Sequence, residues 1–248
     1  MLPQYMRLVA AFISIAAGTT FAVETREVTF EGKRMTVSEI DLRKDQLQLF
    51  LRDDQGVPFK RFARLDGWLR KRDLQLRWAM NAGMYNRDYG AVGLFVAEAK
   101  PLFPLNLANG EGNFFLKPNG VFFITKQGAG VLSAEGYAAQ KPAALLATQS
   151  GPALVLDGRQ HPAFRAGSQN RLHRNGVGVR DPQTVFFALS EDPVNFDEFS
   201  RFFRDRLGCR NALFFDGTVS SLHDARLKRS DEKIDVGPII AITEAKKP

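Results

Sequence analysis

The chain has 248 residues, of which 44% are hydrophobic, and it carries a formal net charge of +7. This is enough apolar material for one sizeable core, and no long linker or fixed-period repeat divides it, which favours a single domain. The single cysteine, Cys209, excludes an intramolecular disulfide, and its place after Gly208 fits a small buried packing residue. The positive charge suits an anionic partner such as a phosphate-bearing glycan, but the basic residues are too scattered to favour nucleic acid.

Residues 1–22 resemble a secretory signal peptide. Arg7 gives a positive start, residues 8–22 are apolar or small, and Thr20-Phe21-Ala22 has the small-x-small spacing of a cleavage site. The stretch is shorter than the roughly 20 apolar residues of a membrane span, and no other run approaches that length. We therefore expect a chain of residues 23–248, periplasmic or secreted, without a stable membrane span. An uncleaved anchor or an amphipathic N-terminal helix is the alternative.

The first half of the chain alternates between strand and helix patterns. Val28 to Leu51 predicts two or three strands, with a hairpin turn at Glu31-Gly32-Lys33. From Pro58 to Arg72 apolar residues recur at helical spacing, and Pro58 suits the first turn of that helix. Pro118-Asn119-Gly120 predicts a turn within a hairpin. Further strands are predicted at residues 76–81, 92–98, 113–116, 121–125, 143–148, 153–156 and 184–189.

The clearest helix begins at Asn195, a good N-cap with Glu198 three residues on, as in a capping box. Its apolar face comprises Phe196, Phe199, Phe202, Phe203 and Leu207, and Gly208 can close it. Residues 223–236 are charged and expected to be loose, before a last strand at 239–242. Strands outnumber helices and short turns join most of them. This predicts an α+β fold with a mixed or largely antiparallel β-sheet core and two main packing helices.

The stretch from Asn211 to Leu222 reads NALFFDGTVSSL and combines a buried strand with a polar turn. Four apolar residues run straight into Asp216-Gly217, as expected for a strand buried on both faces. Such a strand end presents a carboxylate beside hydroxyls and backbone N–H groups. On these residues alone, an ordinary Asp-Gly turn with Asp216 accepting local backbone bonds is the simpler interpretation.

Several reaction classes lack their motifs. The three histidines have no metal-ligand spacing, and neither G-x-S-x-G nor G-x-x-x-x-G-K-[ST] occurs. We therefore predict no metal and no cofactor. What remains is a set of polar turns at strand ends, whose carboxylates, amides and arginines suit a phosphorylated sugar: residues 81–86, 110–113, 149–151, 171–176 and 216–221.

Four motifs, in this order, resemble the phosphodiester glycosidase family: NAGMY at 81–85, QSGP at 149–152, RNGVG at 174–178 and NALFFDG at 211–217. The stretch from Gly110 to Phe122 and the VNFDEF helix start resemble a bacterial exported branch of that family. The resemblance spans roughly residues 76–222. Ala82 replaces the middle residue of the family's Asn-Gly-Gly turn, and Thr218 and Val219 replace two glycines of its Asp-Gly-Gly-Gly-Ser loop.

The resemblance implies a hydrolase that cleaves a sugar-1-phosphodiester, in an envelope or extracellular phosphoglycan, at the glycosidic C–O bond. Ordinary glycosidases use two carboxylates, but a phosphate monoester is already a good leaving group, so one carboxylate and a cationic cradle could suffice. Asp216 is the implied base or charge stabiliser, Arg174 the phosphate ligand and Glu111 the reserve carboxylate. The implied substrate contacts are Asn81, Tyr85, Ser150, Arg171, Gly217, Thr218, Ser220 and Ser221.

Two alternatives stay open. A non-catalytic envelope module of the same fold could bind a phosphosugar without hydrolysing it, and the replaced glycines favour that reading. Cleavage could also occur on the phosphorus side of the diester. At single positions, Arg174 could be a structural ion-pair partner, Asn81 could satisfy only its own turn, and Glu111 could simply be solvated.

Overall fold

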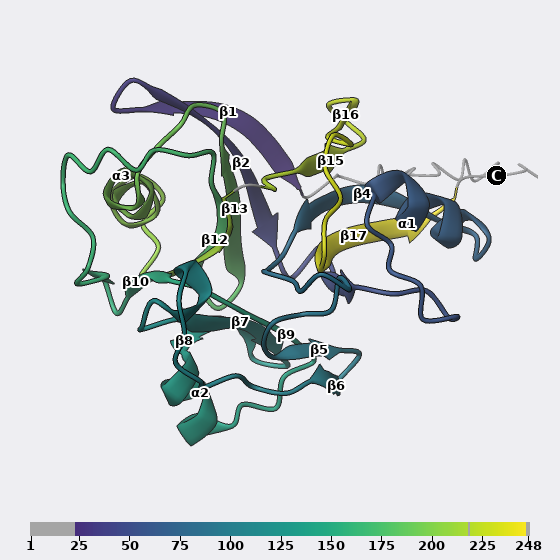
Figure 1. The fold of residues 1–248 in the computed structure, drawn as a ribbon. Coiled ribbons are helices and arrows are strands. Elements are labelled where there is room, and N and C mark those ends of the chain that lie inside the picture. Colours follow the sequence, from purple (N-terminus) through teal and green to yellow (C-terminus); the bar gives the residue numbers. More distant parts are fainter. Residues whose placement is uncertain (1–22, 218, 247–248) are drawn as a thin grey trace, which may run out of the picture.

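In the part of the chain that the structure describes, three antiparallel sheets surround a central core, and three short helices lie outside them (Figure 1). The computed structural model describes residues 23–217 and 219–246. The predicted signal peptide, residues 1–22, and the predicted substrate contact Thr218 lie outside the described residues. The largely antiparallel single domain confirms the predicted α+β class.

The largest sheet has seven strands in the order β1-β2-β13-β12-β14-β10-β11. They are β1 (Glu24–Phe30), β2 (Lys33–Asp41), β13 (Thr184–Ser190), β12 (Asn175–Asp181), β14 (Asn211–Asp216), β10 (Ala153–Leu156) and β11 (Arg159–Gln160). The β1–β2 turn is made by Glu31 and Gly32, with φ of 48° and 73°. Two positive φ values in a two-residue turn match the twist of the flanking strands, and the predicted hairpin is confirmed.

The second and third sheets have five strands each, in the orders β16-β15-β4-β17-β3 and β6-β5-β9-β7-β8. The second contains β16 (Arg229–Ser230), β15 (Leu222–Asp224), β4 (Leu74–Asn81), β17 (Ile239–Ala245) and β3 (Gln48–Phe50). The third contains β6 (Lys100–Phe103), β5 (Phe95–Ala97), β9 (Leu146–Ser150), β7 (Gly120–Thr125) and β8 (Gly128–Ser133).

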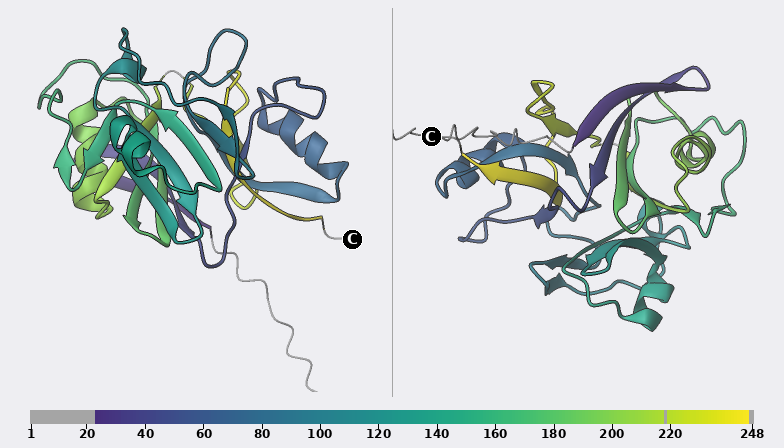
Figure 2. Two further views of the ribbon diagram at one scale, coloured as in Figure 1. Left: turned by 90° about the horizontal axis from the view of Figure 1, so that it is seen from below. Right: turned by 180° about the vertical axis from the view of Figure 1, so that it is seen from behind.

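The central core lies where the inner faces of the three sheets meet. Val177 and Phe215 come from the first sheet, Trp78 and Ile240 from the second, and Phe122 from the third. Side chains alternate between the two faces of a strand, so each sheet gives one face to this core and leaves the other for a helix. The two further views in Figure 2 show the three sheets and their helices from below and from behind.

The predicted capping-box helix is α3 (Phe196–Arg201), which covers the outer face of the seven-stranded sheet. Asn195 accepts from the Glu198 backbone N–H and the Glu198 carboxylate accepts from the Asn195 backbone N–H, so the box is formed. The helix continues as a π-helical turn (Phe202–Arg206), which the sequence pattern does not predict. Burial of each of its core phenylalanines contributes about 1.5–3 kcal/mol.

The other predicted helix, α1 (Phe62–Arg70), covers the outer face of the second sheet. Its predicted start at Pro58 is wrong, because Lys60 has a φ of 63° and Arg61 is extended, and neither conformation continues a helix backwards. A third helix, α2 (Ala134–Gln140), was not predicted and packs Tyr137 against Phe123 of β7, with ring centroids 5.6 Å apart.

Two further expectations need correction. Asn113 to Leu116 is not a strand but contains a 3-10 turn (Asn113–Phe115) that follows Gly112 at a φ of 86°. The segment 223–236 is not wholly loose, because it holds the end of β15 and all of β16. Cys209 is buried, which confirms its predicted role as a packing residue. Burial also raises the pKa of its thiol to about 12.

Candidate functional site

Asp216 stands at the carboxyl end of β14, where the strand leaves the core. Ala212 to Phe215 are fully buried, whereas Asp216 is half-buried. Its backbone N–H donates to Oδ1 of Asn175 across a bulge in the β12–β14 register, at 3.0 Å. A bulge redirects the side chain beside it. The sequence therefore places a carboxylate at the rim of a rigid sheet, as predicted.

A pair of buried side-chain amides lies beneath this strand end. Nδ2 of Asn175 donates to both the backbone and side-chain oxygens of Asn81, at 2.9 Å each. Oδ1 of Asn81 also accepts from the Ser221 backbone N–H at 2.9 Å. The predicted residues Asn81, Ser221 and Asp216 are thus brought together, and Asn175 is the residue that joins them.

Tyr85 brings a hydroxyl to the same region from the turn after β4. Its Oη donates to the backbone oxygen of Asp235 at 2.8 Å. Burial raises the pKa of Tyr85 to about 12, and the negative charge of Asp216 adds to that shift. The carboxylate is therefore close enough to oppose ionisation of the phenol. Tyr85 stays protonated at neutral pH and can take part only as a hydrogen-bonding hydroxyl.

The loop after Asp216 holds the remaining predicted hydroxyls. Ser220 Oγ donates to the backbone oxygen of Asp216 at 3.4 Å. Gly217 is buried, and a Cβ built on it would lie 3.5 Å from the backbone oxygen of His173. The 171–174 segment thus passes directly beside the loop, so the two polar turns are neighbours.

Ser150 supports β14 and does not face the solvent. It is fully buried in β9, and its Oγ donates to the backbone oxygen of Phe215 at 2.9 Å. This bond joins the third sheet to the strand that carries Asp216. The predicted contact between Ser150 and a sugar hydroxyl has no counterpart in this geometry, because the hydroxyl is used within the protein.

Arg174 does not face Asp216, which corrects the expectation of an acid and a guanidinium across one cavity. The guanidinium lies 3.7 Å over the Phe196 ring, on the α3 side of the sheet, whereas Asp216 lies on the Tyr85 side. The physical reason is strand alternation, since Asn175 points towards Asn81 and its neighbour Arg174 must point to the other face of the sheet.

Arg171 is engaged with α3, and Glu111 is exposed to solvent. Arg171 forms an ion pair with Glu198, the capping-box residue of α3. Glu111 is exposed in the loop between β6 and the 3-10 turn. Arg171 as a substrate contact and Glu111 as the reserve carboxylate both remain predictions.

The sequence analysis missed two residues of the site, Asn175 and Asp235. Asn175 lies inside the quoted RNGVG motif, and its place between Arg174 and a glycine-rich strand was the available signal. Asp235 accepts from Arg61 Nε at 2.6 Å and from Tyr89 Oη at 3.0 Å, so it fixes the segment beside Tyr85. No local pattern marks Asp235, because its partners are distant in sequence.

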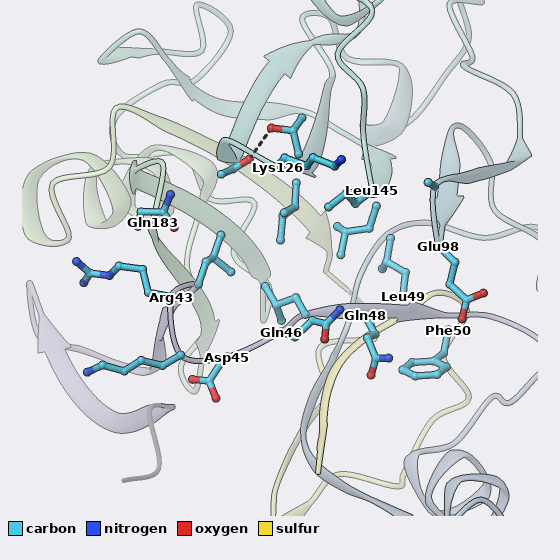
Figure 3. A pocket seen from close by; sticks show the side chains of 18 residues that line it. Arg43, Asp45, Gln46, Gln48, Leu49, Phe50, Glu98, Lys126, Leu145 and Gln183 are labelled. Atoms are coloured by element: carbon cyan, nitrogen blue, oxygen red, sulfur yellow. Dashed lines mark hydrogen bonds between the residues drawn. The ribbon is translucent and has the colours of Figure 1, made fainter. Parts of the chain in front are cut away.

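A large cavity lies elsewhere, where the three sheets meet at the other end of β12. It has a volume of 810 Å³ and includes Gln183, in the β12–β13 turn. In Figure 3 Arg43 and Gln183 lie on one side of it and Glu98 and Phe50 on the other. None of the predicted site residues lines it. About six residues of strand, or about 20 Å, separate the two ends of β12.

Among residues 23–217 and 219–246, no group of three or more His, Cys, Asp or Glu side chains is arranged to hold a metal ion. In the same part of the chain, no helix combines the length and apolar character needed to cross a membrane.

Two solved structures share this fold. The catalytic domain of zebrafish N-acetylglucosamine-1-phosphodiester alpha-N-acetylglucosaminidase, auto-inhibited by its pro-peptide, superposes with a TM-score of 0.59 at 14% identity, covering 89% of this chain and 81% of that one. A hypothetical protein from Synechocystis gives a TM-score of 0.55 at 13% identity, covering 89% and 61%. At these identities the likeness shows the fold alone.

Sequence comparison is more specific. The chain is 34% identical over 149 residues to the uncharacterized protein YigE of Escherichia coli (strain K12), a match that covers 60% of this chain and 58% of YigE. The phosphodiester glycosidase family model matches residues 75–241, most of the chain, including β4, the amide pair and Asp216. The chain therefore belongs to the phosphodiester glycosidase family.

Proposed function

We propose that this protein hydrolyses a sugar-1-phosphodiester on the glycosidic C–O side. The observation that carries the proposal is the position of Asp216, half-buried at the end of β14, beside Tyr85 and held by Asn175. Family membership supports the reaction class. The fold shared with the zebrafish enzyme supports an α-N-acetylglucosamine-1-phosphodiester as the first substrate to test.

In the proposed step Asp216 accepts a proton from water as the water oxygen bonds to the anomeric carbon. The bond from that carbon to the phosphate oxygen breaks, and its electron pair leaves with the phosphate monoester. The transition state resembles an oxocarbenium ion, which a nearby carboxylate stabilises. Because the phosphate leaves as an anion, no second carboxylate is required to protonate it.

The phosphate would lie beside Gly217, where the backbone N–H of Gly217 and the hydroxyl of Ser220 can donate to an anion. The Tyr85 hydroxyl would contact the sugar. Arg174 is left out of this step, because its guanidinium is turned towards Phe196.

The test is a comparison of two Asp-Gly turns. Asp216→Asn should lower kcat by about 100- to 10,000-fold, the range for loss of a general base, while the protein still folds. Asp157→Asn is the matched control, since Asp157 also precedes a glycine but lies in the β10–β11 turn, at a φ of 50° that Asn tolerates. Unchanged turnover in Asp216→Asn would remove the carboxylate from the mechanism.

The same assay separates the alternatives. Saturable binding of the diester by the wild type without release of sugar would support the glycan-binding module. With H₂¹⁸O, label in the released sugar supports cleavage at the glycosidic carbon, and label in the phosphate supports attack on phosphorus.

The proposed site of action is the periplasm or the exterior of the cell, after removal of residues 1–22. The positive start and apolar run of that segment support this. N-terminal sequencing of the protein exported by a bacterial host should give Val23 as the first residue, and an intact Met1 in the exported fraction would contradict it.

A further inference from the structure

Arg174 is a buried cation without a counter-ion. Its side chain is fully buried, and Nη1 has no hydrogen-bond partner among the described residues. Burial alone lowers the pKa of its guanidinium to about 10, with no carboxylate opposing the shift. A buried charge without a partner of opposite sign is unfavourable, and such a group in a native protein calls for an explanation.

The contacts that Arg174 does make orient the guanidinium but do not neutralise it. Nε donates to the backbone oxygen of Val194 at 2.9 Å, and Nη2 donates to that of Asn170 at 3.1 Å. The planar group lies 3.7 Å over the Phe196 ring and 5.6 Å from the Phe214 ring centroid. Neutral carbonyls and ring faces hold the group in a fixed plane, while its positive charge remains uncompensated.

A cavity of 450 Å³ lies next to this guanidinium, on the α3 side of the sheet. Asn170 and Phe196 both line the cavity and both contact Arg174, so they form the wall between the two. Phe164 also lines it and stacks on Phe196, with ring centroids 5.0 Å apart and planes at 6°. Arg174 lies over Phe196, and His161 stacks on Phe164 with ring centroids 4.7 Å apart, so the two rings line the cavity with their edges, as an apolar wall.

The charges around the cavity favour an anion. Arg165 lines it and is exposed. Asp197 also lines it, but its carboxylate accepts from Arg201 Nε at 3.0 Å and from Gln160 Nε2 at 2.8 Å, so it is compensated. With Arg174 behind the wall, the balance of uncompensated charge is positive.

We propose that this cavity binds a sugar phosphate. An oxyanion that enters between Asn170 and Phe196 reaches Nη1 of Arg174 and supplies the missing counter-ion and acceptor. The sugar lies against the apolar wall formed by the edges of Phe164 and Phe196, and Arg165 closes the outer side. This site is separate from the Asp216 site and does not depend on hydrolysis there.

The test measures binding to the purified full chain at constant ionic strength by titration calorimetry and thermal melting. The probes are inorganic phosphate, glucose 6-phosphate and glucose. Glucose 6-phosphate has no glycosidic phosphate bond, so failure of the proposed reaction at Asp216 leaves this result unaffected. Glucose 6-phosphate should bind more tightly than inorganic phosphate, and glucose should not bind. Binding of inorganic phosphate alone would reduce the site to a simple anion site and overturn the sugar assignment.

Arg174→Met separates a ligand site from a packing role. Loss of a charge-assisted hydrogen bond should weaken glucose 6-phosphate binding by at least about tenfold. Without ligand the variant should melt higher than the wild type, because the buried charge is gone. Arg180→Met is the matched control: Arg180 also lies over a ring, 5.0 Å from Phe186, but is half-exposed and paired with Glu39, so binding should be unchanged.

Unchanged glucose 6-phosphate affinity in Arg174→Met would overturn the proposal, as would the absence of saturable binding to the wild type. If Arg174→Met does not fold, Phe164→Ala decides the question, since that ring is half-buried at the cavity wall. It should reduce affinity for glucose 6-phosphate towards that for inorganic phosphate. A preference for the sugar phosphate as large as that of the wild type would exclude Phe164 as the wall that the sugar contacts.

Discussion

Asn175 and Asn81, 94 residues apart in the chain, hold the seven-stranded sheet to the second sheet through their amides. Nδ2 of Asn175 donates twice to Asn81, and its Oδ1 accepts from the backbone of Asp216. Oδ1 of Asn81 also accepts from Ser221. The strand that carries Asp216 and the segment that carries Ser221 are therefore both held by these two amides, which couple the stability of the fold to the position of the catalytic candidate.

Asn175→Asp should destabilise the protein by about 2–4 kcal/mol, since a buried carboxylate cannot donate to Asn81 and leaves two acceptors facing it. Urea unfolding should show a lower midpoint with an unchanged slope. Asn86→Asp, in an exposed turn, is the control and should stay within about 0.5 kcal/mol of the wild type. Equal losses in the free energy of unfolding for the two substitutions would show that the amide pair does not contribute specifically to stability.

The sequence predicted β14 and the capping-box helix well, because both are specified locally. Ala212 to Phe215 is a continuous apolar run, and Asn195 and Glu198 cap their own helix. The direction of Arg174 could not be predicted. A shift of one residue in a strand reverses the face on which every side chain lies, and the bulge beside Asn175 is set by pairing with β14.

The same limit explains the missed contacts. Asp235 meets Arg61 and Tyr89 only after distant segments have folded, and no spacing rule relates them. The start of α1 was misplaced because Pro58 suits a helix locally, while the bridge from Arg52 to Pro58 keeps the chain extended there. The position of Asp235 and the start of α1 are therefore determined by contacts between segments that are distant in the sequence.

Asp235 should make stability depend on pH in the acidic range. Hydrogen bonds from Arg61 and then Tyr89 hold the pKa of Asp235 below its usual 3.8. Since this pKa is lowered in the folded state, the stabilisation is complete above about pH 4 and disappears as the pH falls through the folded-state value. Asp235→Asn should therefore melt about 2–4 °C below the wild type at pH 7, with no difference in strong acid.

Asp73→Asn is the control for that experiment, because Asp73 is exposed and has a φ of 58°, which Asn also adopts readily. It should melt with the wild type at both pH values. A melting difference for Asp235→Asn that persists unchanged into strong acid would show that the carboxylate charge is not what holds this segment.

Cys209 should resist modification as long as the protein is folded. Burial raises the pKa of its thiol to about 12, so almost no thiolate exists at pH 7. A thiol reagent such as DTNB should react fully in urea but only at the rate of global opening in buffer. Fast labelling of the native protein would contradict the burial of this residue.

Gly237 should prove essential to the position of Tyr85, because the ring packs directly against the glycine backbone. A Cβ built at Gly237 would lie 2.5 Å from three atoms of Tyr85, closer than any real contact. Gly237→Ala should therefore displace Tyr85 and lower both the melting temperature and turnover of the diester. Gly67→Ala is the matched control, because Gly67 lies in α1 with no atom near its Cβ position, and it should stabilise the protein by about 0.5–1 kcal/mol.

Adding Tyr85→Ala to the Gly237→Ala variant should relieve the clash and restore part of the melting temperature without restoring turnover. If Gly237→Ala alone leaves both quantities unchanged, Tyr85 has room to move and its position next to Asp216 is not fixed by this glycine.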